Sequence, residues 1–169
     1  MRLFKEKAKN IIGPNVSTFD YPIIVNSYGR SGSTVLTNSI INSSIHFRNE
    51  ILNNIAHRSV SNTAWDLDHS NINDGIVYKT HDYPPQKRLK TKTRVLYTFA
   101  DPVDVVLSVL RLYEVRGEEW VQEHYKHLNV PYNDVRGIIY EDQLKLEKHL
   151  ESWLNYDKLK IAFIKYESM

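Results

Sequence analysis

The stretch that decides the fold is Tyr21-Pro22-Ile23-Ile24-Val25-Asn26-Ser27-Tyr28-Gly29-Arg30-Ser31-Gly32-Ser33-Thr34-Val35-Leu36. The apolar run at 21–25 predicts a buried strand, residues 27–34 form a glycine-rich turn, and residues 35–41 are typical of a helix. Glycine lets a backbone wrap closely around a ligand, and the first N–H groups of a helix lack partners and carry partial positive charge. The order of strand, turn and helix therefore predicts an anion-binding loop.

The side chains of this loop support the same interpretation. Ser33 and Thr34 add hydroxyl donors, and Arg30 adds a permanent positive charge. The loop departs from the G-x-x-x-x-G-K-[ST] pattern of nucleoside-triphosphate-binding proteins, because Ser33 occupies the position of the lysine. A tight turn in which Ser33 or Thr34 only caps the next helix stays an alternative.

Two further apolar runs predict strands downstream of the loop. Residues 92–100 are typical of a buried strand, and Asp101 and Pro102 then fit the N-cap and the first position of a helix. Residues 75–78 form a shorter run that leads into Lys79–His81. Ligands of parallel sheets bind at the carboxyl ends of the strands, where the glycine-rich loop and both of these segments fall.

The rest of the chain continues the alternation of strands and helices. Residues 117–128 and 139–154 predict packing helices, and residues 159–165 predict a last strand. The expected fold is α/β, with a parallel sheet of about four strands flanked by helices in a P-loop-like three-layer sandwich. His124 and His127 have i, i+3 spacing, but no third ligand accompanies them, so no metal site is predicted.

Composition predicts one globular domain over residues 1–169, with 41% hydrophobic and 25% charged residues. A net charge of only +2 argues against nucleic acid as a partner. Cysteine is absent, and neither a signal-peptide pattern nor an apolar run of membrane-spanning length occurs, which favours a cytoplasmic location. Residues 1–20 form a basic lead-in, and residues 46–74 form a polar excursion that either contacts substrate or is a solvated insertion.

Four segments resemble, in the same order, motifs of the sulfotransferase family, whose members use 3′-phosphoadenosine 5′-phosphosulfate as donor. Residues 30–34 resemble the 5′-phosphosulfate loop, with arginine in place of the lysine of the cytosolic enzymes. Residues 79–81 are similar to the K-T-H segment, residues 101–108 to the 3′-phosphate segment, and residues 165–169 to the R-Y-E-D-L strand end. Because the chain stops before the family's later glycine-and-basic segment, the resemblance is to a short or C-terminally truncated form.

The resemblance implies transfer of a sulfuryl group to a hydroxyl of a small-molecule or carbohydrate acceptor, without a metal. It implies that His81 is the general base and that Arg30 and Lys79 assist at the transferred group. The residues expected to bind the 5′ end of the donor are Tyr28, Gly29, Arg30, Ser31, Gly32, Ser33 and Thr34.

The residue that would bind the 3′-phosphate in the sulfotransferase family is missing from this chain. The family usually has an arginine directly before the Asp-Pro pair, and Ala100 stands at that position here. Ser108 alone would contribute a single hydrogen bond, which is weaker than an arginine fork. Arg111 lies one turn later on the same predicted helix face and is the expected substitute.

Three alternative functions remain at this stage. The first is a degenerate nucleotide-binding domain of the same family that has no turnover. The second is a nucleotide kinase or hydrolase, because residues 95–99 followed by Asp101 imitate a strand that ends in a magnesium-binding aspartate. The third is a purely structural module in which Gly29 and Gly32 serve only the turn. The sequence predicts neither the acceptor nor the oligomeric state.

Overall fold

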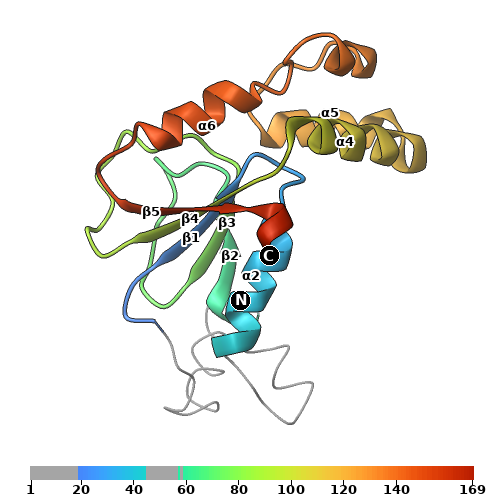
Figure 1. The fold of residues 1–169 in the computed structure, drawn as a ribbon. Coiled ribbons are helices and arrows are strands. Elements are labelled where there is room, and N and C mark those ends of the chain that lie inside the picture. Colours follow the sequence, from blue (N-terminus) through green and yellow to red (C-terminus); the bar gives the residue numbers. More distant parts are fainter. Residues whose placement is uncertain (1–18, 45–56, 58) are drawn as a thin grey trace.

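The computed structural model describes residues 19–44, 57 and 59–169. Its centre is a sheet of five parallel strands in the order β2-β3-β1-β4-β5 (Figure 1). The strands are β1 (Ile23–Ser27), β2 (Ser61–Thr63), β3 (Val77–Thr80), β4 (Arg94–Phe99) and β5 (Lys160–Lys165). The predicted α/β class with a parallel sheet is confirmed, with one strand more than expected.

The additional strand is β2, which lies within the segment 46–74 that was expected to be an irregular excursion. Its three polar residues pair in parallel with β3, with Ser61 opposite Val77. A strand of three polar residues has no alternation of apolar and polar residues by which a sequence could predict it. Pairing with β3 stabilises it instead. Residues 46–56 and 58 of this excursion, residue 45 before it and residues 1–18 of the lead-in lie outside the described part of the chain.

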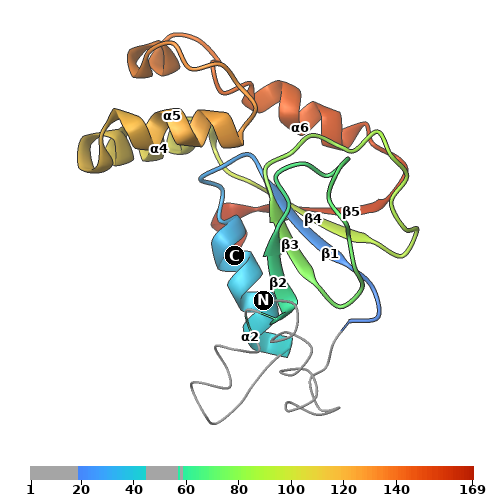
Figure 2. The same ribbon diagram turned by 180° about the vertical axis from the view of Figure 1, so that it is seen from behind.

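Helices cover both faces of the sheet. The helices are α2 (Ser33–Ser44), α4 (Pro102–Arg116), α5 (Glu118–His127) and α6 (Leu146–Leu154), with short 3-10 turns η1 (Val135–Ile139) and η2 (Tyr166–Ser168). Figures 1 and 2 show α2 and α6 on opposite faces, while α4 and α5 extend side by side from the sheet. This arrangement is the expected three-layer sandwich.

Alternation along β1 divides the core between the two faces. Ile23 and Val25 pack with Ile41 of α2, whereas Ile24 packs with Trp153 of α6. Successive side chains of a strand point to opposite faces, so β1 is buried throughout. A third apolar cluster joins α4, α5 and η1 and includes Tyr28 of the loop after β1.

The predicted helix at 139–154 is wrong in its first half. Helix α6 begins only at Leu146, after Lys145 adopts a left-handed backbone with φ of 57°. The Asp142 carboxylate accepts a hydrogen bond of 3.0 Å from the N–H of Leu146 and so caps the start of the helix. Ile139 instead ends η1 and is largely exposed.

Within the described ranges, no helix combines the length and hydropathy that crossing a lipid bilayer requires.

Candidate functional site

The sheet topology places a crevice beside β1. The chain leaves β1 toward β2 at one edge of the sheet, whereas it leaves the neighbouring strand β4 toward β5 at the other edge. Loops that follow two adjacent strands in opposite directions leave a gap at the carboxyl ends, which is where open α/β sheets bind ligands. The glycine-rich loop follows β1, and Asp101 follows β4.

The loop after β1 has an unusual backbone. Gly29, Arg30 and Gly32 have φ angles of 46°, 56° and 80°, which lie in the left-handed region. For arginine this conformation costs on the order of 1 kcal/mol, and such strain gathers at functional sites. The N–H of Leu36 donates to the carbonyl oxygen of Gly32 at 3.0 Å, so the loop leads directly into the first turn of α2.

Two cations of the site, Arg30 and Lys79, are tied to neighbouring segments. Nε of Arg30 donates to Oγ of Ser108 on α4 at 2.9 Å, and Nζ of Lys79 donates to Oγ1 of Thr34 at 2.8 Å. Burial lowers the pKa of Lys79, and the positive charge of Arg30 lowers it further. The two positive groups therefore repel each other in the isolated protein, and an anion placed between them would relieve that repulsion.

His81 is buried at the end of β3, with 8% of its surface exposed. Its Nδ1 lies 2.7 Å from the carbonyl oxygen of Ser27 and 3.4 Å from the backbone nitrogen of Gly29. The Gly29 N–H points at Nδ1 as a donor, but the contact to the Ser27 carbonyl oxygen is much shorter, and a carbonyl oxygen only accepts. The shorter contact therefore favours the tautomer with the proton on Nδ1 and the lone pair on Nε2. Burial lowers the pKa of His81 to about 3, and the ring is neutral at pH 7.

A polar pocket of about 570 Å³ lies at this crevice. It brings together residues from β3, α2, α4 and the loop that the sequence had singled out separately. Its lining includes the predicted residues Arg30, Gly32, Ser33, Thr34, Lys79, His81, Ser108 and Arg111, and also Ala100. Three predicted residues, Tyr28, Gly29 and Ser31, do not line it.

Tyr28 and Ser31 instead face away from the polar pocket. Tyr28 belongs to the apolar cluster of α4, α5 and η1, with its ring 4.7 Å from that of His149. The Ser31 hydroxyl donates to the carbonyl oxygen of Gly29 at 3.0 Å and thus braces the turn. The side chains of Tyr28 and Ser31 are placed to support the loop rather than to contact a ligand in the polar pocket.

The pocket also contains aromatic and imidazole side chains. Trp65 comes from the excursion 46–74, one interpretation of which was contact with substrate, whereas the wall formed by α5 was not assigned to the site. Trp65 stacks on His127 at 4.7 Å, and Trp120 stacks on His124 at 5.0 Å between ring centres. Burial lowers the pKa of His124 to about 4, and its buried Nε2 has no partner among the described residues. The i, i+4 spacing of Trp120 and His124 on α5 is the one sequence signal for this wall. No group of three or more metal-binding side chains occurs in the described ranges.

Asp101 acts on its own helix. Its carboxylate accepts a hydrogen bond of 2.8 Å from the N–H of Val103, and Pro102 is the first residue of α4, as predicted. The N–H of Asp101 in turn donates to Oε1 of Glu167 at 3.2 Å, which holds the end of β5 against the start of α4. A carboxylate used in this way is a helix cap.

No protein-family model matches the chain, and neither curated proteins nor solved structures contain a match. The features that bear on function are the geometry of the polar pocket and the chemistry of the residues that line it.

Proposed function

We propose that the protein is a sulfotransferase that moves a sulfuryl group from 3′-phosphoadenosine 5′-phosphosulfate to a hydroxyl of a small-molecule or carbohydrate acceptor. The observation that carries this proposal is the meeting of Arg30, Lys79 and His81 with Ser108 and Arg111 in one pocket. Cations, a neutral imidazole and a helix N-terminus in one crevice match the needs of group transfer from an anionic donor.

The loop and the start of α2 are suited to the phosphosulfate end of the donor. Backbone N–H groups at a helix N-terminus attract anions, and Arg30 and Lys79 add two full positive charges beside them. When the bond between sulfur and the bridging oxygen breaks, its electron pair goes to the departing phosphate. Arg30 and Lys79 stabilise the charge that grows there.

His81 is suited to the acceptor. As the acceptor oxygen forms its new bond to sulfur, Nε2 of His81 takes the hydroxyl proton. The hydrogen bond from Nδ1 to Ser27 holds the ring in the tautomer that this step needs. Burial lowers the pKa of His81 to about 3, and the negative charge of a bound donor raises it toward the range in which a general base is effective.

The 3′-phosphate has candidate partners on α4. Ser108 and Arg111 lie on the wall of the pocket that α4 forms, and Arg30 donates to the Ser108 hydroxyl. Arg111 supplies the positive charge that Ala100 lacks. The kinase alternative is weaker, because the Asp101 carboxylate that would hold magnesium already caps α4.

The test is calorimetry with 3′-phosphoadenosine 5′-phosphate against ATP plus Mg²⁺, followed by assays of labelled sulfate transfer to a panel of hydroxyl acceptors. We expect binding of the bisphosphate without metal, at higher affinity than ATP, and transfer to at least one acceptor. A metal-dependent preference for ATP would overturn the proposal in favour of a kinase or hydrolase. Donor binding without transfer to any acceptor would identify a degenerate binding domain.

A further inference from the structure

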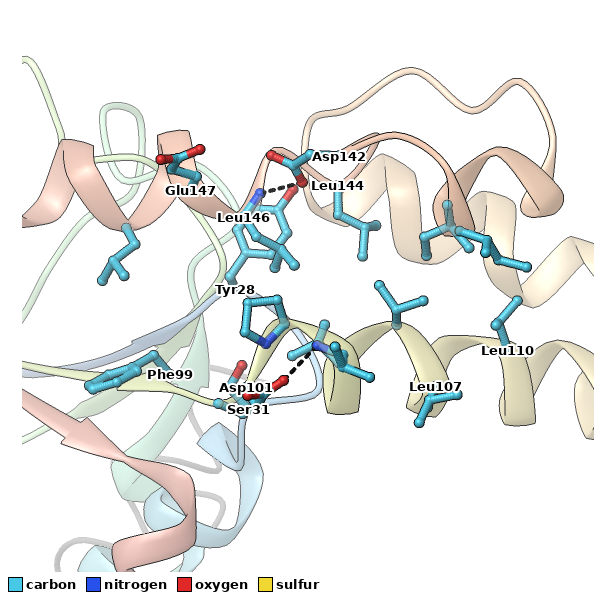
Figure 3. A pocket seen from close by; sticks show the side chains of 18 of the residues that line it. Tyr28, Ser31, Phe99, Asp101, Leu107, Leu110, Asp142, Leu144, Leu146 and Glu147 are labelled. Carbon is cyan, nitrogen blue, oxygen red and sulfur yellow. Dashed lines mark hydrogen bonds between the residues drawn. The ribbon is translucent and has the colours of Figure 1, made fainter.

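A second cavity, of about 1000 Å³, lies between α4 and the segment from η1 to α6 (Figure 3). Its walls are mostly aliphatic and aromatic, with Val106 and Leu110 on the α4 side and Leu144 and Leu146 on the other. Figure 3 shows Leu110 and Leu144 on opposite sides of the open space. Mostly apolar cavities of this size with a few polar groups are typical binding sites for small molecules.

The inner end of this cavity carries a polar group without a partner. Tyr28 is 3% exposed, and its hydroxyl makes no hydrogen bond to any described residue. Burial raises the pKa of Tyr28, and the negative charge of nearby Asp142 raises it further, so the phenol stays protonated. A buried hydroxyl without a hydrogen bond is costly, and a ligand that pairs with its oxygen removes that cost.

Acidic side chains line the cavity where the chain enters α6. Glu141, Asp142 and Glu147 line it, and none of them forms an ion pair with a described basic residue. Lys165 is the one basic residue of the described lining, and it lies 3.8 Å from Glu167. The carboxylates therefore favour a cationic group and disfavour an anion.

We propose that this cavity binds hydrophobic amines, with the apolar body between α4 and α6 and the ammonium group at the end formed by Tyr28 and Asp142. An ammonium group has three donors and no acceptor, which matches the phenol oxygen and the surrounding carboxylates. The inference does not depend on sulfuryl transfer, because neither Lys79 nor His81 lines this cavity.

The test is calorimetry at pH 7 with three rigid probes that share one hydrocarbon cage: 1-adamantanamine, 1-adamantanol and 1-adamantanecarboxylate. We expect the amine to bind about tenfold more tightly than the alcohol, and the carboxylate to bind most weakly. Asp142→Asn, in which asparagine can still cap α6, should weaken the amine severalfold without affecting the alcohol. Glu151→Gln, an exposed position of α6 outside the cavity, is the matched control and should change neither affinity. Equal affinity for all three probes, tightest binding of the carboxylate, or no binding at millimolar concentration would overturn the proposal.

A cavity-filling variant locates the binding. Val106→Trp should abolish amine binding, whereas Val115→Trp, on a position of α4 that is 80% exposed, should leave it unchanged. Methyl NMR shifts in the unmutated protein keep the test independent of the folding of either variant. The amine should move the signals of Leu110 and Leu144, and shifts confined to residues outside the cavity would contradict the assignment.

Discussion

A Cβ atom at Gly29 would lie 2.6 Å from Cε1 of His124, so α5 packs directly onto the backbone of the glycine-rich loop. That separation is far below van der Waals contact, and no side chain fits at Gly29 while His124 keeps its place. Gly29 also has a φ of 46°, which favours glycine for a second reason. The shape of the loop thus depends on a helix that begins 89 residues later, at Glu118.

We predict that Gly29→Ala lowers both stability and affinity for 3′-phosphoadenosine 5′-phosphate, the latter about tenfold or more, because the loop must move away from His124. Gly117→Ala is the matched control, since Gly117 also has a positive φ, of 80°, but faces open space. It should cost on the order of 1–3 kcal/mol of stability and leave affinity unchanged. Calorimetry and thermal melting measure both quantities. Equal affinity in the two variants would contradict the role of this packing.

Arg30→Ala should weaken binding of the bisphosphate by about 1.5–3 kcal/mol, the usual contribution of a hydrogen bond to a charged group. Stability should change little, because alanine adopts the left-handed conformation at φ of 56° with similar strain. Arg30→Gly should weaken binding equally and raise stability by roughly 1 kcal/mol, since glycine relieves that strain. A large loss of stability in Arg30→Ala would assign this residue to folding instead.

Arg111→Ala should reduce affinity for 3′-phosphoadenosine 5′-phosphate and leave affinity for adenosine 5′-phosphate nearly unchanged. The difference between the two ligands isolates the 3′-phosphate, which Arg111 is proposed to hold from its place on α4. Arg116→Ala, at the far end of the same helix and outside the pocket, should affect neither ligand. Equal losses for both ligands in Arg111→Ala would disprove the assignment, and Ala100→Arg should tighten binding of the bisphosphate alone.

His81→Asn should lower the rate of sulfate transfer by a factor of roughly 10²–10⁴ while donor affinity stays within a few-fold of the unmutated protein. Asparagine retains a donor that can reach the carbonyl oxygen of Ser27, but it has no basic nitrogen for the acceptor proton. His69→Asn, on an exposed histidine that does not line the pocket, is the control and should transfer normally. Undiminished transfer by His81→Asn would rule out its role as the base.

Acid should destabilise the protein through its buried histidines. His149 is fully buried, with Nε2 at 3.0 Å from the carbonyl oxygen of Asp82 and Nδ1 at 2.7 Å from the Tyr97 hydroxyl. Burial lowers the pKa of His149 to about 4. As the pH falls below 6.5, His149 therefore becomes protonated in the unfolded chain, whereas in the folded protein it stays neutral until about pH 4.

Stability should consequently fall as the pH drops from 6.5 toward 4, by up to about 1.4 kcal/mol per pH unit for each such histidine. His81 and His124 add to the same trend, because burial lowers the pKa of each, to about 3 and about 4. His149→Gln should reduce the slope of unfolding free energy against pH by the amount that corresponds to the uptake of about one proton. Urea unfolding at a series of pH values measures the slope, and an unchanged slope in the variant would refute the contribution of His149.

Local patterns predicted most of the backbone. The apolar runs before Ser27, Lys79 and Asp101 became β1, β3 and β4, and Asp101 caps α4 as its place before proline indicated. Each of these signals depends on hydrogen bonding or periodicity within a few residues, which a sequence displays directly. By contrast, Ser61–Thr63 is a strand only because β3 lies beside it, and α6 begins at Leu146 because the backbone reverses just before it.

The sequence could predict that Arg30, Lys79 and His81 lie close together. Each follows or ends a parallel strand, and the carboxyl ends of neighbouring parallel strands lie on the same side of a sheet. The excursion that contains Trp65 was one candidate for substrate contact, but nothing local revealed that His124 would join the site or that Tyr28 would turn toward the apolar cavity. Those outcomes depend on how α5 packs on α4 and the glycine-rich loop and how α6 packs on the sheet, and therefore on contacts between residues that are distant in the chain. Such contacts follow from the shapes and volumes of whole elements, which no short segment of sequence contains.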